Sequence, residues 1–129
     1  MTKRSILVSY LISKGAGRSS GMRVWSDGQA EIKTGAEPWK KVVRLEAEAL
    51  GRLGGALRAS GIRELPARLG ALEGVFDAPA CTWQASFDEA TIKAVVEGWT
   101  DARADDLRLG SLMDLIYQEI SEAQMSATR

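Results

Sequence analysis

Hydrophobic and polar residues alternate along residues 5–13 of the chain. The apolar positions on one side of this segment are Ile6, Val8, Tyr10 and Ile12. Serines occupy much of the other side, which Leu7 and Leu11 interrupt. A period of two is typical of a β-strand. The interruptions predict a strand that is partly covered on both faces.

Two further short segments with β character follow at 22–25 and 29–33, separated by Ser26-Asp27-Gly28. Asp and Gly both tolerate the positive φ that a tight hairpin turn requires. Together with residues 5–13, these segments predict a three-stranded antiparallel meander over residues 5–33.

The spacing becomes helical at residues 38–59. Pro38 suits the first turn of a helix, because its φ is preset and its missing N–H has no partner there. The apolar stripe consists of Val42, Val43, Leu45, Leu50, Leu53 and Leu57. We expect this helix to end near Ser60-Gly61. The glycines at 51, 54 and 55 predict either close approach to a neighbouring element or a kink.

A second hairpin is predicted at residues 80–98, where apolar and polar residues alternate on both sides of Asp88-Glu89. We interpret Asp88 and Glu89 as turn residues. The one-sided pattern is typical of an antiparallel sheet with one packed and one solvated face. Before this hairpin, the spacing of Ile62, Leu65, Leu69 and Leu72 indicates a short helix followed by an irregular connection.

A polar loop is expected at residues 100–110, and Ser111 is predicted to cap a last helix that frays after about Ala123. The order is therefore three strands, a helix, a possible short helix, two strands and a helix. This order predicts a single α+β domain over residues 1–129. Its sheet would be antiparallel with about five strands, and the helices would pack on one face.

The composition is that of an ordinary globular domain, with 45% hydrophobic and 26% charged residues. The formal net charge is zero, so the basic excess that is typical of nucleic-acid-binding proteins is missing. The apolar run near the N-terminus is short and lacks a signal cleavage site, and no stretch reaches transmembrane length. We expect a cytoplasmic protein with no nucleic-acid or membrane partner. The use of alanine, glycine and arginine suggests a GC-rich bacterial source.

The chain contains no histidine and a single cysteine, Cys81. These counts exclude a Ser-His-Asp triad, a Cys-His pair, an intramolecular disulfide and a multi-cysteine zinc site. Cys81 lies on the apolar side of its predicted strand, so we place it in the core. Asp101, Asp105 and Asp106 lack the spacing and the central glycine of a calcium loop. We therefore expect no catalytic, cofactor-binding or metal-binding residues.

Residues 17–21 spell G-x-S-x-G, the pattern of a hydrolase nucleophile elbow. That elbow joins a strand to a helix, whereas here a strand is predicted to follow. A phosphate loop is also disfavoured, since Arg18 replaces its lysine and no helix follows. We interpret the segment as a hairpin loop in which Arg18 makes at most a weak anion contact. A Ser19 nucleophile activated by Lys14 or Lys33 is the less favoured alternative.

The four tryptophans give the most informative hypothesis. Trp83 shares the apolar side of its strand and is assigned to the core, and Trp39 is expected to close the start of the first helix against the sheet. Tryptophan is enriched in interface hot spots. If the remaining tryptophans share the open sheet face, that face is a candidate partner site, the alternative being that a helix or loop covers them. The candidate residues are Trp25, Leu7, Leu11, Val95 and Trp99.

These observations favour a non-catalytic interaction or regulatory domain that binds a protein partner, or a second copy of itself, through the sheet face. The alternative is a small-ligand-binding domain with a pocket between sheet and helices, lined by Trp83, Trp39 and Tyr10. An enzyme that uses carboxylates or Cys81 is the third and least favoured hypothesis.

Overall fold

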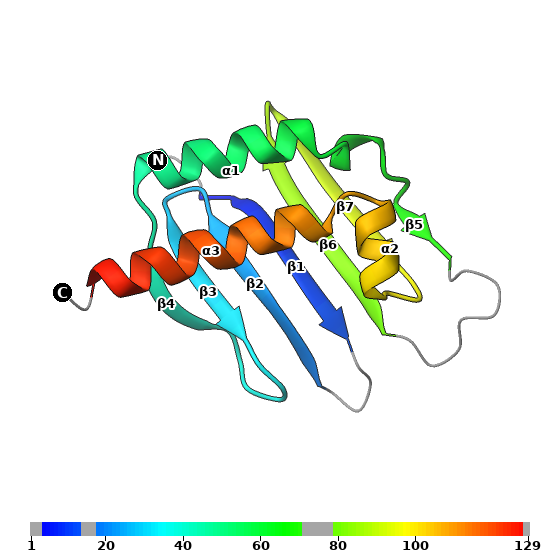
Figure 1. The fold of residues 1–129 in the computed structure, drawn as a ribbon, viewed down its shortest axis with the longest axis horizontal. Helices are drawn as coiled ribbons and strands as arrows, with labels where there is room; N and C mark the ends of the chain where they lie inside the picture. Colours follow the sequence, from blue (N-terminus) through cyan, green and yellow to red (C-terminus); the bar gives the residue numbers. More distant parts are fainter. Residues whose placement is uncertain (1–3, 14–17, 71–78, 128–129) are drawn as a thin grey trace.

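The strands of the sheet lie side by side in the order β4-β3-β2-β1-β6-β7-β5 (Figure 1). The computed structural model describes residues 4–13, 18–70 and 79–127. In these residues the strands are β1 Ile6–Ser13, β2 Ser19–Trp25, β3 Gln29–Lys33, β4 Lys40–Arg44, β5 Arg68–Leu69, β6 Ala80–Phe87 and β7 Ala90–Val96. The helices are α1 Ala47–Ala59, the 3₁₀ turn η1 Ile62–Glu64, α2 Asp101–Asp106 and α3 Gly110–Ala127. The prediction of an α+β fold is confirmed.

The predicted meander is present. β1 pairs with β2 and β2 with β3, both antiparallel. Gly28 adopts φ +97° in the turn between β2 and β3, and its N–H donates to the Trp25 carbonyl at 2.9 Å. The Asp-Gly turn was predictable because its chemistry is local: glycine supplies the positive φ, and the Asp27 carboxylate accepts from the N–H of Gln29.

The predicted start of the first helix is wrong. Residues 40–44 instead form β4, an edge strand that pairs antiparallel with β3, and α1 begins only at Ala47. Val42 and Val43 are β-branched and favour a strand, while the adjacent lysines suit an exposed sheet edge. Compared with the prediction, the sheet therefore has one more strand and the helix is about two turns shorter.

The end of α1 is confirmed, because the helix stops at Ala59 and Gly61 follows in the left-handed region with φ +75°. The glycines inside α1 do not all serve close packing. A Cβ added at Gly51 or Gly55 would meet nothing within 4 Å, whereas Gly54 is buried. Close approach therefore gives no reason for glycine at positions 51 and 55.

The short helix predicted after residue 62 is wrong in the described part of the chain. Ile62–Glu64 form only a 3₁₀ turn, and Arg68–Leu69 form β5, which pairs parallel with β7. This pairing makes the sheet mixed and seven-stranded, rather than antiparallel with about five strands. Leu72, which belonged to the predicted helix, lies outside the described residues.

The second hairpin is confirmed, with β6 and β7 paired from Cys81–Val96 to Phe87–Ala90. Asp88 and Glu89 both adopt positive φ, +51° and +63°. Positive φ at both central residues is the geometry of a type I′ turn, which matches the twist of the flanking strands.

The polar segment 100–110 is not all loop. Asp101–Asp106 form α2, whose N-terminus is capped by the Thr100 side chain, which accepts from the N–H of Arg103. Ser111 does not cap α3, because the helix already begins at Gly110, and it continues to Ala127. No helix in the described ranges has both the length and the apolar composition required to cross a membrane.

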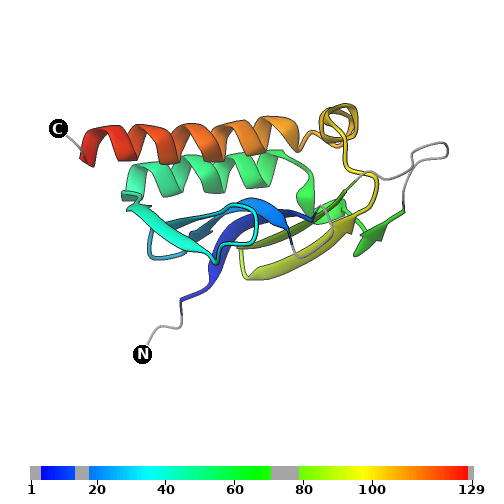
Figure 2. The ribbon, with the colours of Figure 1, turned by 90° about the horizontal axis from the view of Figure 1, so that it is seen from below.

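All three α-helices lie on the same side of the sheet, and they leave its other face uncovered (Figures 1 and 2). The core lies between the two layers. Tyr10 and Trp83 have ring centroids 5.3 Å apart, and Trp83 and Trp99 have centroids 6.3 Å apart. The prediction that Trp83 belongs to the core is confirmed, since its side chain is fully buried.

Candidate interaction surface on the open sheet face

The strand register defines which side chains share the open face, because residues paired across a ladder point to the same side of a sheet. One row crosses six strands and contains Lys41, Glu31, Arg23, Ser9, Gln84 and Lys93. A second row contains Lys33, Gly21, Leu11, Thr82, Val95 and Arg68. The open face is thus predominantly polar, with two aliphatic side chains in its second row.

Tryptophan and arginine side chains from β2 and from the segments that precede β1 and β4 stack on this face. The Arg23 guanidinium carbon lies 4.1 Å from the ring centroid of Trp39 and 5.1 Å from that of Trp25. Arg4 covers Trp25 at 4.0 Å. We call these four residues the tryptophan–arginine cluster. Arginine over an indole ring is a favourable cation–π arrangement, so the cluster is held by contacts of its own members.

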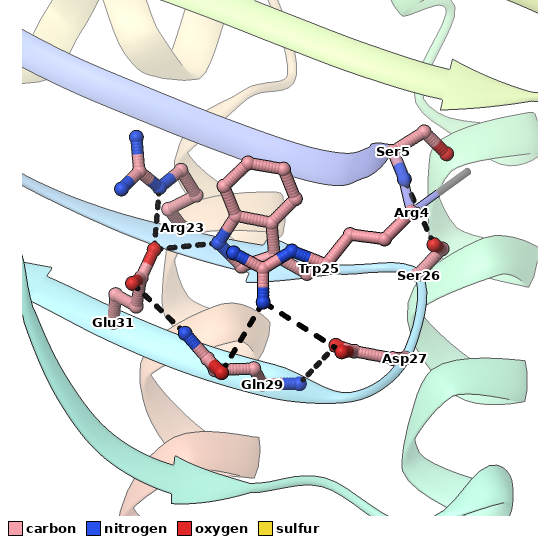
Figure 3. A network of polar contacts seen from close by, with 8 residues as sticks. All are labelled: Arg4, Ser5, Arg23, Trp25, Ser26, Asp27, Gln29 and Glu31. Atoms are coloured by element: carbon pink, nitrogen blue, oxygen red, sulfur yellow. Dashed lines mark hydrogen bonds and ion pairs between the residues drawn. The ribbon is translucent and has the colours of Figure 1, made fainter.

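Glu31 anchors the cluster from β3 (Figure 3). Its Oε1 atom accepts from Arg23 Nε and from Trp25 Nε1, both at 2.6 Å, and its Oε2 atom accepts from Gln29 Nε2 at 3.0 Å. Burial of the Glu31 carboxyl raises its pKa, but the hydrogen bonds from Trp25, Arg23 and Gln29 outweigh this effect and hold the pKa below its ordinary value. Glu31 is therefore a charged acceptor that fixes two members of the cluster.

The hairpin turn between β2 and β3 fixes the outer edge of the cluster. Arg4 donates to the side-chain oxygen of Gln29 at 3.2 Å and lies 3.7 Å from the Asp27 carboxylate. The Ser26 hydroxyl accepts from the N–H of Ser5. Figure 3 shows a continuous network of contacts from Arg23 to Asp27 on the side of the sheet away from the helices, and the Ser5–Ser26 hydrogen bond lies beside it.

The predicted partner-binding residues do not all meet on this surface. Trp25 belongs to the cluster, and Leu11 and Val95 share the second row on either side of Thr82. Leu7 lies where the β1 register shifts, between Ile6 and Val8, and it packs against the core.

Trp99 requires a correction. It is buried at 6% exposure and contacts Trp83 in the core, so it cannot line the open face. The reason is that its segment returns toward the core after β7: the Trp99 N–H donates to the carbonyl of Pro79 at 2.7 Å. No sequence pattern distinguishes a tryptophan that lies on the open face at the end of a hairpin from one whose segment turns back into the core.

Three residues of the cluster, Arg4, Arg23 and Trp39, are not among the predicted partner-binding residues. Trp39 was assigned to the start of a helix, but it precedes β4 and stacks on Arg23 instead. Arg23 alternates with Val24 and therefore lies on the same side of β2 as Trp25. The alternation in β2 was the available signal, whereas Trp39 depended on recognising β4 as a strand.

The structure does not support the alternative pocket lined by Trp83, Trp39 and Tyr10. Tyr10 and Trp83 pack directly against each other and are buried, and Trp39 contacts Arg23 on the opposite face of the sheet. A concavity of about 710 Å³ does occur elsewhere, between α1, α2 and α3. It is open to solvent and is lined by residues such as Ala56, Arg108 and Leu115.

The G-x-S-x-G segment has a structural explanation at its last glycine. Ser19–Trp25 form β2, so Ser19 begins a strand rather than an elbow, while residues 14–17 lie outside the described ranges. A Cβ on Gly21 would come within 1.9 Å of the Tyr10 carbonyl oxygen on β1. Glycine is therefore required by the close approach of two strand backbones. Lys33, one of the candidate bases, donates its ammonium protons to the carbonyls of Gly35 and Glu37.

Cys81 is fully buried, as predicted, and burial raises the pKa of its thiol to about 12. A thiol in this environment is a poor nucleophile, because the reactive form is the thiolate. Among the described residues, no three His, Cys, Asp or Glu side chains are grouped so that they could hold a metal ion. No protein-family model and no curated protein sequence matches this chain.

Proposed function

We propose that this chain is a non-catalytic interaction domain that binds a protein partner through the open face of its sheet. The observation that carries the proposal is the tryptophan–arginine cluster, which Glu31 fixes on a face that no described helix covers. Tryptophan and arginine are the residue types most enriched in interface hot spots, together with tyrosine.

The rigidity of the cluster supports the same conclusion. A long side chain that is ordered only on binding loses conformational entropy, which weakens the complex. Arg23 already has one hydrogen bond and two aromatic neighbours in the free protein. Binding of a partner therefore requires little further loss of conformational entropy from the Arg23 side chain.

The test is a pull-down with the tagged chain from a lysate of the cells that produce it. Trp39→Ala and Trp25→Ala remove the two indoles of the cluster. Tyr117→Ala is the matched control, because Tyr117 is an aromatic residue on α3 with 62% of its surface exposed. We expect the wild type and Tyr117→Ala to retain the same protein in stoichiometric amounts, and both tryptophan variants to lose it.

Purified samples of that protein should then bind the wild-type chain directly. Equal retention by all four forms, or retention of no protein, would argue against the proposal. Capture that disappears after nuclease treatment would identify a nucleic-acid ligand instead. A second copy of the chain as the retained protein would replace the partner with self-association.

A further inference from the structure

Two nitrogens of the Arg23 guanidinium remain available to donate hydrogen bonds to a partner. Its Nε donates to Glu31, and none of the described residues accepts from Nη1 or Nη2. In Figure 3 these two nitrogens point away from Glu31. A guanidinium presents its N–H groups as a planar fork that matches the two oxygens of a carboxylate.

The surroundings of Arg23 keep this fork in place while leaving it accessible. The indoles of Trp25 and Trp39 lie beside it, and 20% of the Arg23 side chain is exposed. A partly desolvated charge interacts more strongly with an incoming anion than a fully solvated one. The site therefore favours a negatively charged group that approaches from solvent.

The first 45 residues, which include the whole cluster, are basic, although the whole chain is neutral. Residues 1–45 contain nine of the 17 Lys and Arg residues but only three of the 17 Asp and Glu residues. Two of those three acids are already engaged, Glu31 with Arg23 and Asp27 with Arg4. Lys41 lies opposite Glu31 in the register of β3 and β4, and Lys93 lies at the far end of the same row. The two rows of the open face contain five basic residues and one acidic residue, Glu31, so the charge facing a partner is positive.

The stacking within the cluster favours an acidic protein over a nucleic acid. Single-stranded nucleic acids bind to open sheets by stacking their bases on aromatic rings. Here Arg4 lies over Trp25, and Arg23 lies over Trp39. These guanidinium groups occupy ring faces that a base would need.

We infer that Arg23 binds a carboxylate side chain of an acidic segment in the partner protein, with Lys41 and Lys93 adding longer-range attraction. This inference rests on the proposed function and specifies the chemistry of the partner at the same surface.

The test uses the purified chain and a short fluorescein-labelled peptide of alternating glutamate and serine, and binding is followed by fluorescence anisotropy. A peptide with glutamine in place of glutamate controls for the backbone, and oligothymidylate of equal charge controls for general anion binding. Arg23→Gln removes the fork, and Arg108→Gln removes one positive charge from the helical layer. Arg23→Lys keeps the charge but not the fork. Thermal unfolding verifies that each variant is folded.

We expect the glutamate peptide to bind in a salt-sensitive manner. Arg23→Gln should weaken binding at least about tenfold, because charge-assisted hydrogen bonds are lost. Arg23→Lys should bind with intermediate affinity, and Arg108→Gln should match the wild type. No binding of the peptide, equal binding by Arg23→Gln, or tighter binding of oligothymidylate would overturn the inference. If the pull-down still identified a protein that depends on Trp39, the proposed function would stand while the acidic partner would be rejected.

Discussion

Arg52 of α1 and Glu119 of α3 form a two-point ion pair, with Nε–Oε2 and Nη2–Oε1 distances of 2.5 and 2.8 Å. Glu119 is 4% exposed, whereas the Arg52 side chain is 54% exposed. The hydrogen bonds from Arg52 lower the pKa of Glu119 and outweigh the opposing effect of burial. The pair joins the two long helices and satisfies a carboxylate that would otherwise be buried without a partner.

Arg52→Met should therefore lower the urea midpoint of unfolding, because it leaves the Glu119 carboxylate buried and unpaired. Arg58→Met is the control, since Arg58 pairs with Asp88, whose side chain is 38% exposed. We expect a smaller loss in that control, as exposed pairs contribute little. The double variant Arg52→Met/Glu119→Met should regain stability relative to Arg52→Met alone. Equal losses for the two arginine variants would contradict the assigned role of Glu119.

Gly21→Ala should destabilise the fold by about 3 kcal/mol or more, because the added Cβ would collide with the backbone of β1. Gly51→Ala provides the contrast. It adds the same methyl group where nothing lies within 4 Å, and it should stabilise α1 by up to about 1 kcal/mol. Chemical denaturation of both variants measures the difference. A Gly21→Ala protein with wild-type stability would show that the strands can separate at no cost.

The lowered pKa of Glu31 makes stability depend on pH. A carboxyl with a lowered pKa in the folded state contributes stability at pH values above its unfolded pKa of about 4.3. This contribution is lost as the pH falls through the pKa of the folded state. Glu31→Gln should therefore flatten the acid limb of a plot of unfolding free energy against pH. Glu37→Gln, at an exposed position, removes the same charge and serves as the control. An unchanged acid limb in Glu31→Gln would argue against the anchoring role of this residue.

Cys81 should react slowly with a thiol reagent in the native protein at pH 8. Burial raises its pKa to about 12, and access requires opening of the sheet. We expect reaction at least about 100-fold faster in denaturing urea, because only the exposed thiol ionises at its ordinary pKa. The chain contains one cysteine, so the measurement reports on this site alone. Rapid native labelling would revive the hypothesis of a reactive thiol.

Glu89→Gly should stabilise the β6–β7 hairpin by about 1 kcal/mol, since Glu89 adopts φ +63° in the turn and a non-glycine residue is disfavoured there. Glu89→Ala is the control: it removes the same carboxylate but keeps a Cβ, so it should bring no comparable gain. Thermal unfolding of the two variants separates the backbone effect from the charge effect. Equal melting temperatures would show that the turn is not strained.

Local chemistry explains which parts of the fold were predictable. The Asp27-Gly28 and Asp88-Glu89 turns, the strands beside them and the end of α1 depend on residues close in the sequence. β4 was missed because Val42 and Val43 fit both a helical stripe and a strand, and the pairing with β3 decided between them. β5 contains only two residues and exists because β7 offers a partner edge. Such tertiary contacts leave no periodic pattern in so short a segment.

The candidate surface was predictable only in part for the same reason. Trp25 could be placed on the open face because it is out of phase with Met22 and Val24. The contact between Arg23 and Trp39 joins β2 to the segment just before β4, and β2 and β4 are not neighbours in the sheet, so predicting it required the correct assignment of β4. Trp99 was misplaced because its position depends on how the chain turns after the last strand.

The neutral total conceals an uneven distribution of charge along the chain: residues 1–45 carry a formal charge of +6 and the remainder −6. Residues 1–45 contain nine of the 17 Lys and Arg residues, and the remainder of the chain, including the three helices, carries 14 of the 17 acidic residues. A protein of this kind orients itself in the field of a charged surface, presenting whichever end is attracted. Near its isoelectric point it should therefore be retained on both cation- and anion-exchange resins, although its total charge is close to zero.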